Sequence, residues 1–205
     1  MILLETAASR IATATSDYGL ACHPELSLRE STARVRLINS VLSPLSLPTE
    51  LRDFWTWWAP ELFSRPVLDG FLTGDEAVDL RQSMIDIGYP EMLLPIARFG
   101  KGLVWIELQS KDHPGSRVFY GGYADPELRL WAIGVSGLLE LVAETIESGG
   151  VITWAADQHR LNPAAFHSAL NGQLAKVTDS ATEFKRIPIA DASQWPAHWK
   201  ASSSR

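Results

Sequence analysis

Two places in the chain carry side chains that could support acid–base chemistry. Asp157 and His159 are two positions apart, which places them on one face of a strand but on different sides of a helix. A carboxylate beside an imidazole can orient a general base, although a histidine satisfied by hydrogen bonds is the commoner outcome. Glu107 is the second place, because it interrupts an extended apolar run. An enzymatic function would rest on these three residues.

The possible metal ligands stand far apart and show no paired spacing: Cys22, His23, His113, His159, His167 and His198. A zinc site needs three or four such ligands to converge, so we expect no metal. The glycines at 100–102 and 121–122 lack the lysine–serine pair and following helix of a phosphate-binding loop. They are interpreted as turns, and we expect no cofactor.

Ser136 lies in the pentapeptide Gly-Val-Ser-Gly-Leu. A nucleophile elbow has a second glycine two residues after the serine, and leucine stands there instead. Ser136 is therefore interpreted as the N-cap of a helix, and no catalytic residue is assigned to the chain.

Composition favours an acidic protein of a reducing compartment. The 205 residues include one cysteine and carry a net charge of −6, so no internal disulfide can form and we expect a cytoplasmic location. No apolar run approaches the ~20 residues of a membrane span, and the first residues lack the basic start of a secretory signal. The acidic balance disfavours nucleic acid as a direct partner. It serves either solubility or the attraction of a basic protein.

Periodicity predicts helices first and strands afterwards. Helices are expected over 3–14, from 27 to Pro44, over 48–59 and over 75–87, the second and fourth beginning with the capping boxes Ser27/Glu30 and Thr73/Glu76. Strands are expected over 92–99, 103–109, 117–120 and 129–132. Short connections favour antiparallel pairing. The fold class predicted is α+β, with helices packed on a mostly antiparallel sheet.

The remaining elements divide the chain into three parts. A helix from Ser136 ends at Gly149–Gly150, a strand covers 151–155, and Asn162–Pro163 begins another helix. We expect a helical segment at 1–46, a core at 47–150 and an extension at 151–205 that belongs to the same domain. Residues 187–189 and 195–199 are expected to dock back on the body.

Eight tryptophans are too many to leave exposed, so most must be core residues. Trp57 falls about 100° away from the apolar stripe of its helix and is a candidate exposed anchor, the alternative being a ring packed under a loop. Trp105 and Glu107 share the face of their strand that lies opposite Val104 and Ile106. Trp57, Trp105 and Glu107 are the candidate protein-binding residues.

Four segments occur in the order typical of one known family: 47–54 (LPTELRDF), the hairpin 94–108, 115–120 (GSRVFY) and 136–141 (SGLLEL). On these segments the chain resembles the SMI1/KNR4 family, also called the SUKH superfamily, over about 47–148. The resemblance implies an α+β domain that works by binding proteins. In bacteria such domains are chiefly immunity proteins that neutralise toxins, and in fungi they include a regulatory partner of the cell-wall pathway.

The leading hypothesis is therefore a cytoplasmic, non-enzymatic immunity protein whose partner is a protein, with a basic toxin domain as the candidate. A housekeeping or regulatory scaffold of the same fold is the alternative. The sequence does not fix the oligomeric state.

Overall fold

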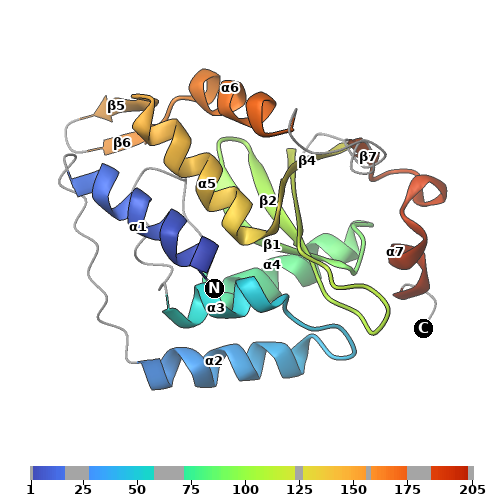
Figure 1. Ribbon diagram of the computed structural model, residues 1–205. Coiled ribbons are helices and arrows are strands. Elements are labelled where there is room, and N and C mark those ends of the chain that lie inside the picture. Colours follow the sequence, from blue (N-terminus) through green and yellow to red (C-terminus); the bar gives the residue numbers. More distant parts are fainter. Residues whose placement is uncertain are drawn as a thin grey trace.

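The structure, a computed structural model, describes residues 2–16, 28–57, 72–122, 127–155, 158–174 and 186–202. Within them the chain forms an α+β fold in which helices pack on an antiparallel sheet, as the sequence predicts (Figure 1). Every helix in this part of the chain falls short of the length and apolarity needed to cross a bilayer.

The four helices predicted before the sheet are confirmed. They are α1 (Ile2–Ser16), α2 (Leu28–Val41), α3 (Thr49–Trp57) and α4 (Gly74–Asp86). The predicted capping box of α4 is present, because the Thr73 side chain accepts the Glu76 N–H at 3.3 Å and the Glu76 carboxylate accepts the Thr73 N–H at 2.8 Å. Local sequence therefore sets where this helix begins.

Four predicted strands and one further strand form a five-stranded sheet in the order β1-β2-β3-β4-β7. The strands are β1 (Leu93–Phe99), β2 (Gly102–Glu107), β3 (Arg117–Gly122), β4 (Glu127–Ile133) and β7 (Arg186–Pro188), and all neighbours are antiparallel. Phe99 pairs with Gly102, so β1 and β2 are joined by a two-residue turn. Gly100 has φ 56° there, a conformation that glycine adopts without a Cβ clash.

Aromatic side chains cover both faces of the sheet. On the face of Val104, Tyr120 stacks on Trp131 with ring centroids 4.5 Å apart. Phe166 of α6 (Pro163–Leu174) lies against Trp131, and α5 (Gly134–Glu147) packs on β3 and β4. On the other face Tyr89 stacks on Trp105. The sheet therefore has no face left for solvent along its central strands.

The helix predicted from Ser136 is present, but Ser136 is not its N-cap. Ile133 is the N-cap and makes no side-chain hydrogen bond. Ser136 is the third residue of α5, in its first turn, where its N–H and hydroxyl both donate to the carboxylate of Glu50, at 3.2 and 2.9 Å. The hydrogen-bond acceptor for the first turn of α5 is thus the carboxylate of Glu50 in α3, and a carboxylate at a helix N-terminus is stabilising.

The segment predicted as an extension completes the sheet. After α5, β5 (Val151–Ala155) and β6 (Gln158–Leu161) form a hairpin, and β6 was not predicted. β7 then pairs with β4, and the short 3₁₀ helix η3 (Ala192–Gln194) and α7 (Ala197–Ser202) follow. Residues 187–189 and 195–199 do return to the body, since Ile187, Ile189 and Trp199 are buried in the core.

Candidate functional site

The side chain of Glu107 collects four hydrogen bonds inside the protein. Glu107 ends β2 and has 0% solvent exposure. Its Oε1 accepts from Arg117 Nη2, His198 Nε2 and Trp199 Nε1, each at 2.6 Å. Its Oε2 accepts from Arg117 Nε at 2.9 Å. A buried carboxylate is tolerated when it is paired with a charge and hydrogen-bonded, and Glu107 meets both conditions.

The loop between β2 and β3 turns Arg117 back toward Glu107. Ile106 pairs with Val118, so Arg117 is next to Glu107 across the two strands. Within the loop Gly115 has φ 70° and Ser116 has φ 87°. A Cβ on Gly115 would lie 2.6 Å from the carbonyl oxygen of Glu107, so the close approach requires glycine. Ser116 adopts a conformation that costs a non-glycine residue on the order of 1–3 kcal/mol, and this strain lies beside the site.

The C-terminal elements bring two more donors to Glu107. Trp195 Nε1 donates to the carbonyl oxygens of Pro188 and Ile189, both at 3.2 Å. Asp191 caps η3 by accepting the Ser193 N–H at 3.0 Å. These local contacts fix the turn from β7 into α7, and α7 carries His198 and Trp199.

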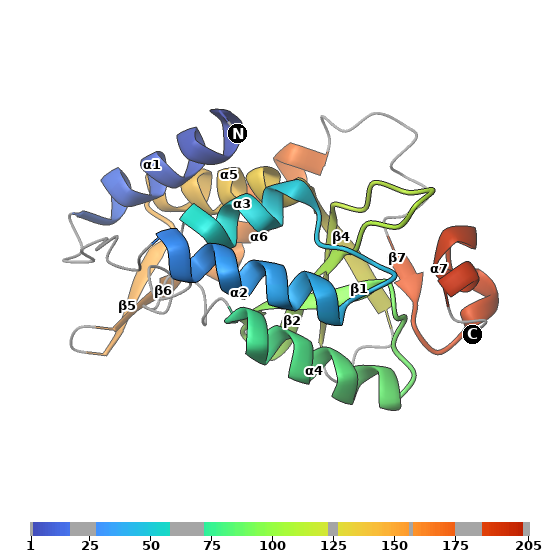
Figure 2. The ribbon, with the colours of Figure 1, turned by 90° about the horizontal axis from the view of Figure 1, so that it is seen from below.

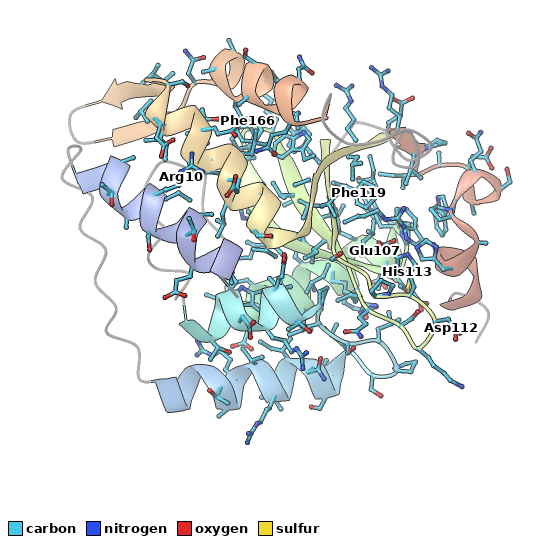
Figure 3. All side chains as sticks on the ribbon, in the orientation of Figure 1. Arg10, Glu107, Asp112, His113, Phe119 and Phe166 are labelled. Carbon is cyan, nitrogen blue, oxygen red and sulfur yellow. The ribbon has the colours of Figure 1, made fainter. Side chains whose placement is uncertain are left out.

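The ring of Trp199 has 0% exposure and meets the edge of Phe119 with centroids 5.6 Å apart. We call Glu107, His113, Arg117, His198 and Trp199 the Glu107 cluster. Figure 3 shows Glu107 and His113 together between the sheet and α7.

The imidazoles of His113 and His198 lie face to face, with centroids 3.9 Å apart and planes 7° apart. His198 Nε2 must carry a proton, because it lies 2.6 Å from a carboxylate oxygen. Arg117 Nη2 is 2.9 Å from the same nitrogen, so both N–H groups point at Glu107 and neither accepts from the other. His113 Nδ1 accepts the Gly115 N–H at 3.1 Å. That nitrogen is therefore unprotonated.

Charge and burial act in opposite directions on Glu107. Burial alone would raise the pKa of Glu107, but the hydrogen bonds and charge of Arg117, with the bonds from His198 and Trp199, outweigh it and hold the pKa below its ordinary value. Burial lowers the pKa of His113, and this effect exceeds the upward pull of Glu107. The 3.8 Å approach of His113 Nδ1 to Glu107 Oε2 is thus a contact of a neutral ring and not an ion pair.

Three members of the cluster could supply metal ligands. Glu107, His113 and His198 place one ligand atom each within 4.8 Å of the others, and zinc accepts such a donor set. Arg117 Nη2, however, lies 2.6 Å from Oε1 and 2.9 Å from His198 Nε2, where an ion shared by these two atoms would lie. The lone pairs of two nearly parallel rings also lie in separate planes and do not meet at one point. The cluster holds the guanidinium as its cation.

Two of the three predicted protein-binding residues, Trp105 and Glu107, are buried. Trp105 is 1% exposed and Glu107 is 0% exposed. These two side chains do not lie on an open face of the hairpin, because Tyr89 stacks on Trp105 at 4.9 Å and α7 covers Glu107. Neither side chain can serve as an exposed anchor. Trp57 is the last residue of α3, and its side chain lies outside the described part of the structure.

The acid–base candidates do not come together as the sequence suggested. Asp157 lies outside the described residues, and His159 is described only as a position in β6 paired with Thr153. The imidazoles near Glu107 are those of His198 and His113. The expectation that the histidines stand apart is therefore wrong for this pair.

Sequence reasoning did not bring Arg117, His113, His198 and Trp199 together with Glu107. They lie on a strand, a loop and a helix far apart in the chain, and no fixed spacing marks them. The one available signal was Glu107 itself, because an acid inside an apolar strand needs a partner if the strand is buried.

A second feature lies along α1. An open groove of about 660 Å³ is lined by Glu5, Thr6, Ser9, Arg10, Thr13, Ala14 and Glu147. Arg10 donates to both carboxylate oxygens of Glu147, at 2.9 and 2.6 Å. Figure 3 places Arg10 at the opposite end of the molecule from Glu107, so the groove and the Glu107 cluster are separate.

Comparison of the chain with protein-family models, with curated proteins and with solved structures finds no match. The geometry of the described residues and the sequence itself are therefore the basis for assigning a function.

Proposed function

We propose that this protein is a non-enzymatic binding protein of the immunity type, which neutralises a toxin by forming a complex with it. The observation that carries the proposal is the way Glu107 is satisfied. Its two oxygens accept four hydrogen bonds from side chains of β3 and α7, and it has no exposed surface. The most distinctive titratable group of the described residues thus holds elements of the fold together.

A catalytic carboxylate must reach its substrate, either directly or through one water. Glu107 cannot do so without breaking its bonds to Arg117 and Trp199. Arg117 is itself only 12% exposed and is committed to the same carboxylate. Their hydrogen bonds and opposite charges instead attach α7 to the sheet, so we assign them a structural role.

The toxin in the proposal comes from the resemblance of residues 47–148 to the SMI1/KNR4 family. The acidic balance, with a net charge of −6, suits a basic protein as the partner. The single cysteine suits a cytoplasmic location, where an immunity protein meets a toxin made in the same cell. A housekeeping or regulatory scaffold of the same fold is the alternative, and it would bind proteins other than toxins.

A second candidate function is enzymatic, and one contact favours it. His198 is bonded to Glu107 at 2.6 Å, and its side chain is 22% exposed, so its outer nitrogen could act as a general base oriented by the carboxylate. His198→Asn tests this candidate. If the chain protects cells from a toxin by catalysis, the variant loses protection while it still binds the toxin.

The decisive experiment for the main proposal is neutralisation. The toxin encoded beside the gene is induced in cells with and without this chain, and the two proteins are then purified together. We expect growth to be restored and a stable complex to be recovered. If the chain neither protects nor binds, the immunity function is refuted. If it binds only proteins unrelated to toxins, the scaffold alternative is correct.

A further inference from the structure

Two large apolar side chains lie one helical turn apart on the outer side of α2. Leu37 is 62% exposed and Val41 is 60% exposed, and residues at i and i+4 face the same direction. The opposite side of this part of the chain is buried in the core through Val35, Ile38 and Leu42. Among the described residues, the only other large hydrophobic side chains with comparable exposure are Ile87 and Ile133. The Leu37–Val41 pair is therefore not used in the packing of the fold.

The neighbouring helix α4 exposes acids on its outer side. Asp75, Asp79 and Asp86 are exposed and share one side at helical spacing. The inner side carries the buried residues Gly74, Ala77 and Met84. Arg81, the one basic residue of α4, turns toward the main chain and donates to the carbonyl oxygen of Glu91. It does not neutralise Asp79 or Asp86.

The two outer sides form one surface. α2 and α4 lie side by side in the view from below (Figure 2). Arg34 Nε on α2 lies 3.8 Å from Asp75 Oδ2 on α4, so these two side chains form an ion pair and Asp75 already has a basic partner. A Cβ on Gly74 would collide with the Ile38 side chain, so the helix backbones approach closely at that point. An apolar strip on α2 thus runs beside an acidic strip on α4.

We propose that this α2–α4 surface, formed by Leu37, Val41, Asp79 and Asp86, is the docking surface for a basic amphipathic segment of the partner protein. The inference rests on the proposed binding function and adds where the partner binds and what chemistry it presents. Apolar side chains of the segment cover Leu37 and Val41, and its lysines or arginines meet Asp79 and Asp86. The exposed apolar pair supplies the desolvated centre that binding surfaces need.

Charge selects this occupant over others. A second copy of the chain in a two-fold arrangement would present the same acidic helix to the interface, and like charges brought together there are unfavourable. Nucleic acids and anionic membranes carry the same sign of charge as α4. A basic amphipathic segment is attracted by the aspartates, and its apolar side chains leave water by packing against Leu37 and Val41.

The test uses the full chain and a defined probe. A synthetic helical peptide of lysine and leucine, with leucines at i and i+4, is titrated into the isotope-labelled protein and followed by NMR. We expect shift changes confined to α2 and α4 and an affinity that falls as salt is added. The double variant Leu37→Ser/Val41→Ser and the double variant Asp79→Asn/Asp86→Asn should each lose about tenfold or more in affinity. A peptide with glutamate in place of lysine should not bind.

Matched control variants distinguish a loss of affinity caused by the α2–α4 surface from one caused by any change in exposed apolar area or net charge. Ile133→Ala removes most of another exposed apolar side chain, and alanine is as poor an N-cap for α5 as isoleucine. Glu5→Gln removes an exposed acid from α1. Both should keep the affinity within about twofold, as substitutions outside an interface do. All of the changed side chains lie on the surface, so circular dichroism and thermal unfolding should match those of the parent chain. Any loss of affinity can then be assigned to the contact.

Several results would overturn the proposal. One is that shift changes lie elsewhere or are absent, and another is that the glutamate peptide binds equally well. A dimer of the chain that dissociates in the Leu37→Ser/Val41→Ser variant would show that a second copy covers the surface. If that variant still neutralises the toxin fully, the docking surface is wrong while the immunity function stands. If the lysine peptide maps to α2 and α4 but no toxin is neutralised, the surface stands and the immunity function falls.

Discussion

Trp199 donates its indole N–H to Glu107 Oε1 over 2.6 Å, although 92 residues separate them in the chain. The bond joins α7 to the end of β2. His198 and Arg117 donate to the same oxygen, so one charged group is shared by a helix and two strands. The stability of the sheet and the attachment of α7 therefore depend on the same carboxylate.

Replacing Glu107 with glutamine should destabilise the protein by about 3 to 5 kcal/mol, because it leaves the buried Arg117 guanidinium without its counter-charge. The shape of the side chain is nearly unchanged, so the loss reports charge and hydrogen bonding and not packing. Urea unfolding followed by circular dichroism measures the difference.

Glu147→Gln is the matched control for that substitution. Glu147 also pairs with an arginine, Arg10, but its side chain is 43% exposed. A surface pair contributes about 0–1 kcal/mol. If Glu107→Gln costs no more than Glu147→Gln, the Glu107 cluster does not stabilise the fold in the way described.

Replacing Trp199 with phenylalanine should loosen α7 while the sheet remains folded. The change keeps an aromatic ring against Phe119 but removes one hydrogen bond to a charged group, which is worth about 1.5–3 kcal/mol. Hydrogen exchange should become faster in α7 first. The double variant Glu107→Gln/Trp199→Phe should lose less unfolding free energy than the two single variants lose together, because both substitutions remove the same hydrogen bond. Full additivity would contradict the shared bond.

Stability should fall as the pH drops below about 6.5, and His113 should account for part of that fall. Burial sets the pKa of His113 in the folded protein below its ordinary value of 6.5, so as the pH falls the unfolded chain takes up the proton first. Stability then decreases with decreasing pH until the folded pKa is passed. Glu107 has a lowered pKa as well, and its contribution is lost at lower pH, below its ordinary value of 4.5.

Unfolding free energies of the parent chain and of His113→Gln, measured between about pH 5 and pH 7.5, test this dependence. The variant should show a shallower slope just below pH 6.5. His198 and Arg117 face the same carboxylate and remain in both proteins, so the difference between the two slopes belongs to His113. Identical slopes would mean that His113 is not buried as a neutral ring.

Zinc should bind the Glu107 cluster only after Arg117 is removed. In Arg117→Met the three ligand atoms of Glu107, His113 and His198 lose the guanidinium that lies among them, and rotation of one imidazole can then let them converge. Zinc at about 100 times its dissociation constant should stabilise this variant by ~2.7 kcal/mol. Thermal unfolding with and without zinc measures the effect.

Adding His113→Ala to Arg117→Met should abolish the zinc effect, because only two ligands remain. The parent chain should be indifferent to zinc. Stoichiometric binding of zinc by the parent chain would instead mean that a metal displaces Arg117, and the cluster would then be a metal centre.

Local signals explain which elements the sequence predicts correctly. The capping box of Thr73 and Glu76 is present in the structure as predicted, because both partners lie within one helical turn. Gly100 permits a two-residue hairpin turn for the same reason. Asn162 accepts the Ala164 N–H at 3.0 Å at the start of α6. Each of these contacts is complete within a few residues, so it does not depend on a partner from a distant part of the chain.

Features that depend on distant partners were beyond the sequence. Ser136 has the residue type of an N-cap, but Glu50 of α3 takes the hydrogen-bonding role. The face of β2 that carries Trp105 and Glu107 has a polar residue at the expected outer position, yet α7 covers it. Alternation in a strand identifies two faces and does not tell how many of them are covered.

Ribosomes add Glu107 to the growing chain 92 residues before Trp199. At about 5–20 residues per second this interval lasts roughly 5 to 18 s, during which β1 to β4 exist without the donors of α7. A polypeptide that stalls or is cut within the interval lacks α7, so Glu107 keeps only its two hydrogen bonds from Arg117 and loses the helix that covers it. Synthesis must therefore be completed through Trp199 before the Glu107 cluster can form.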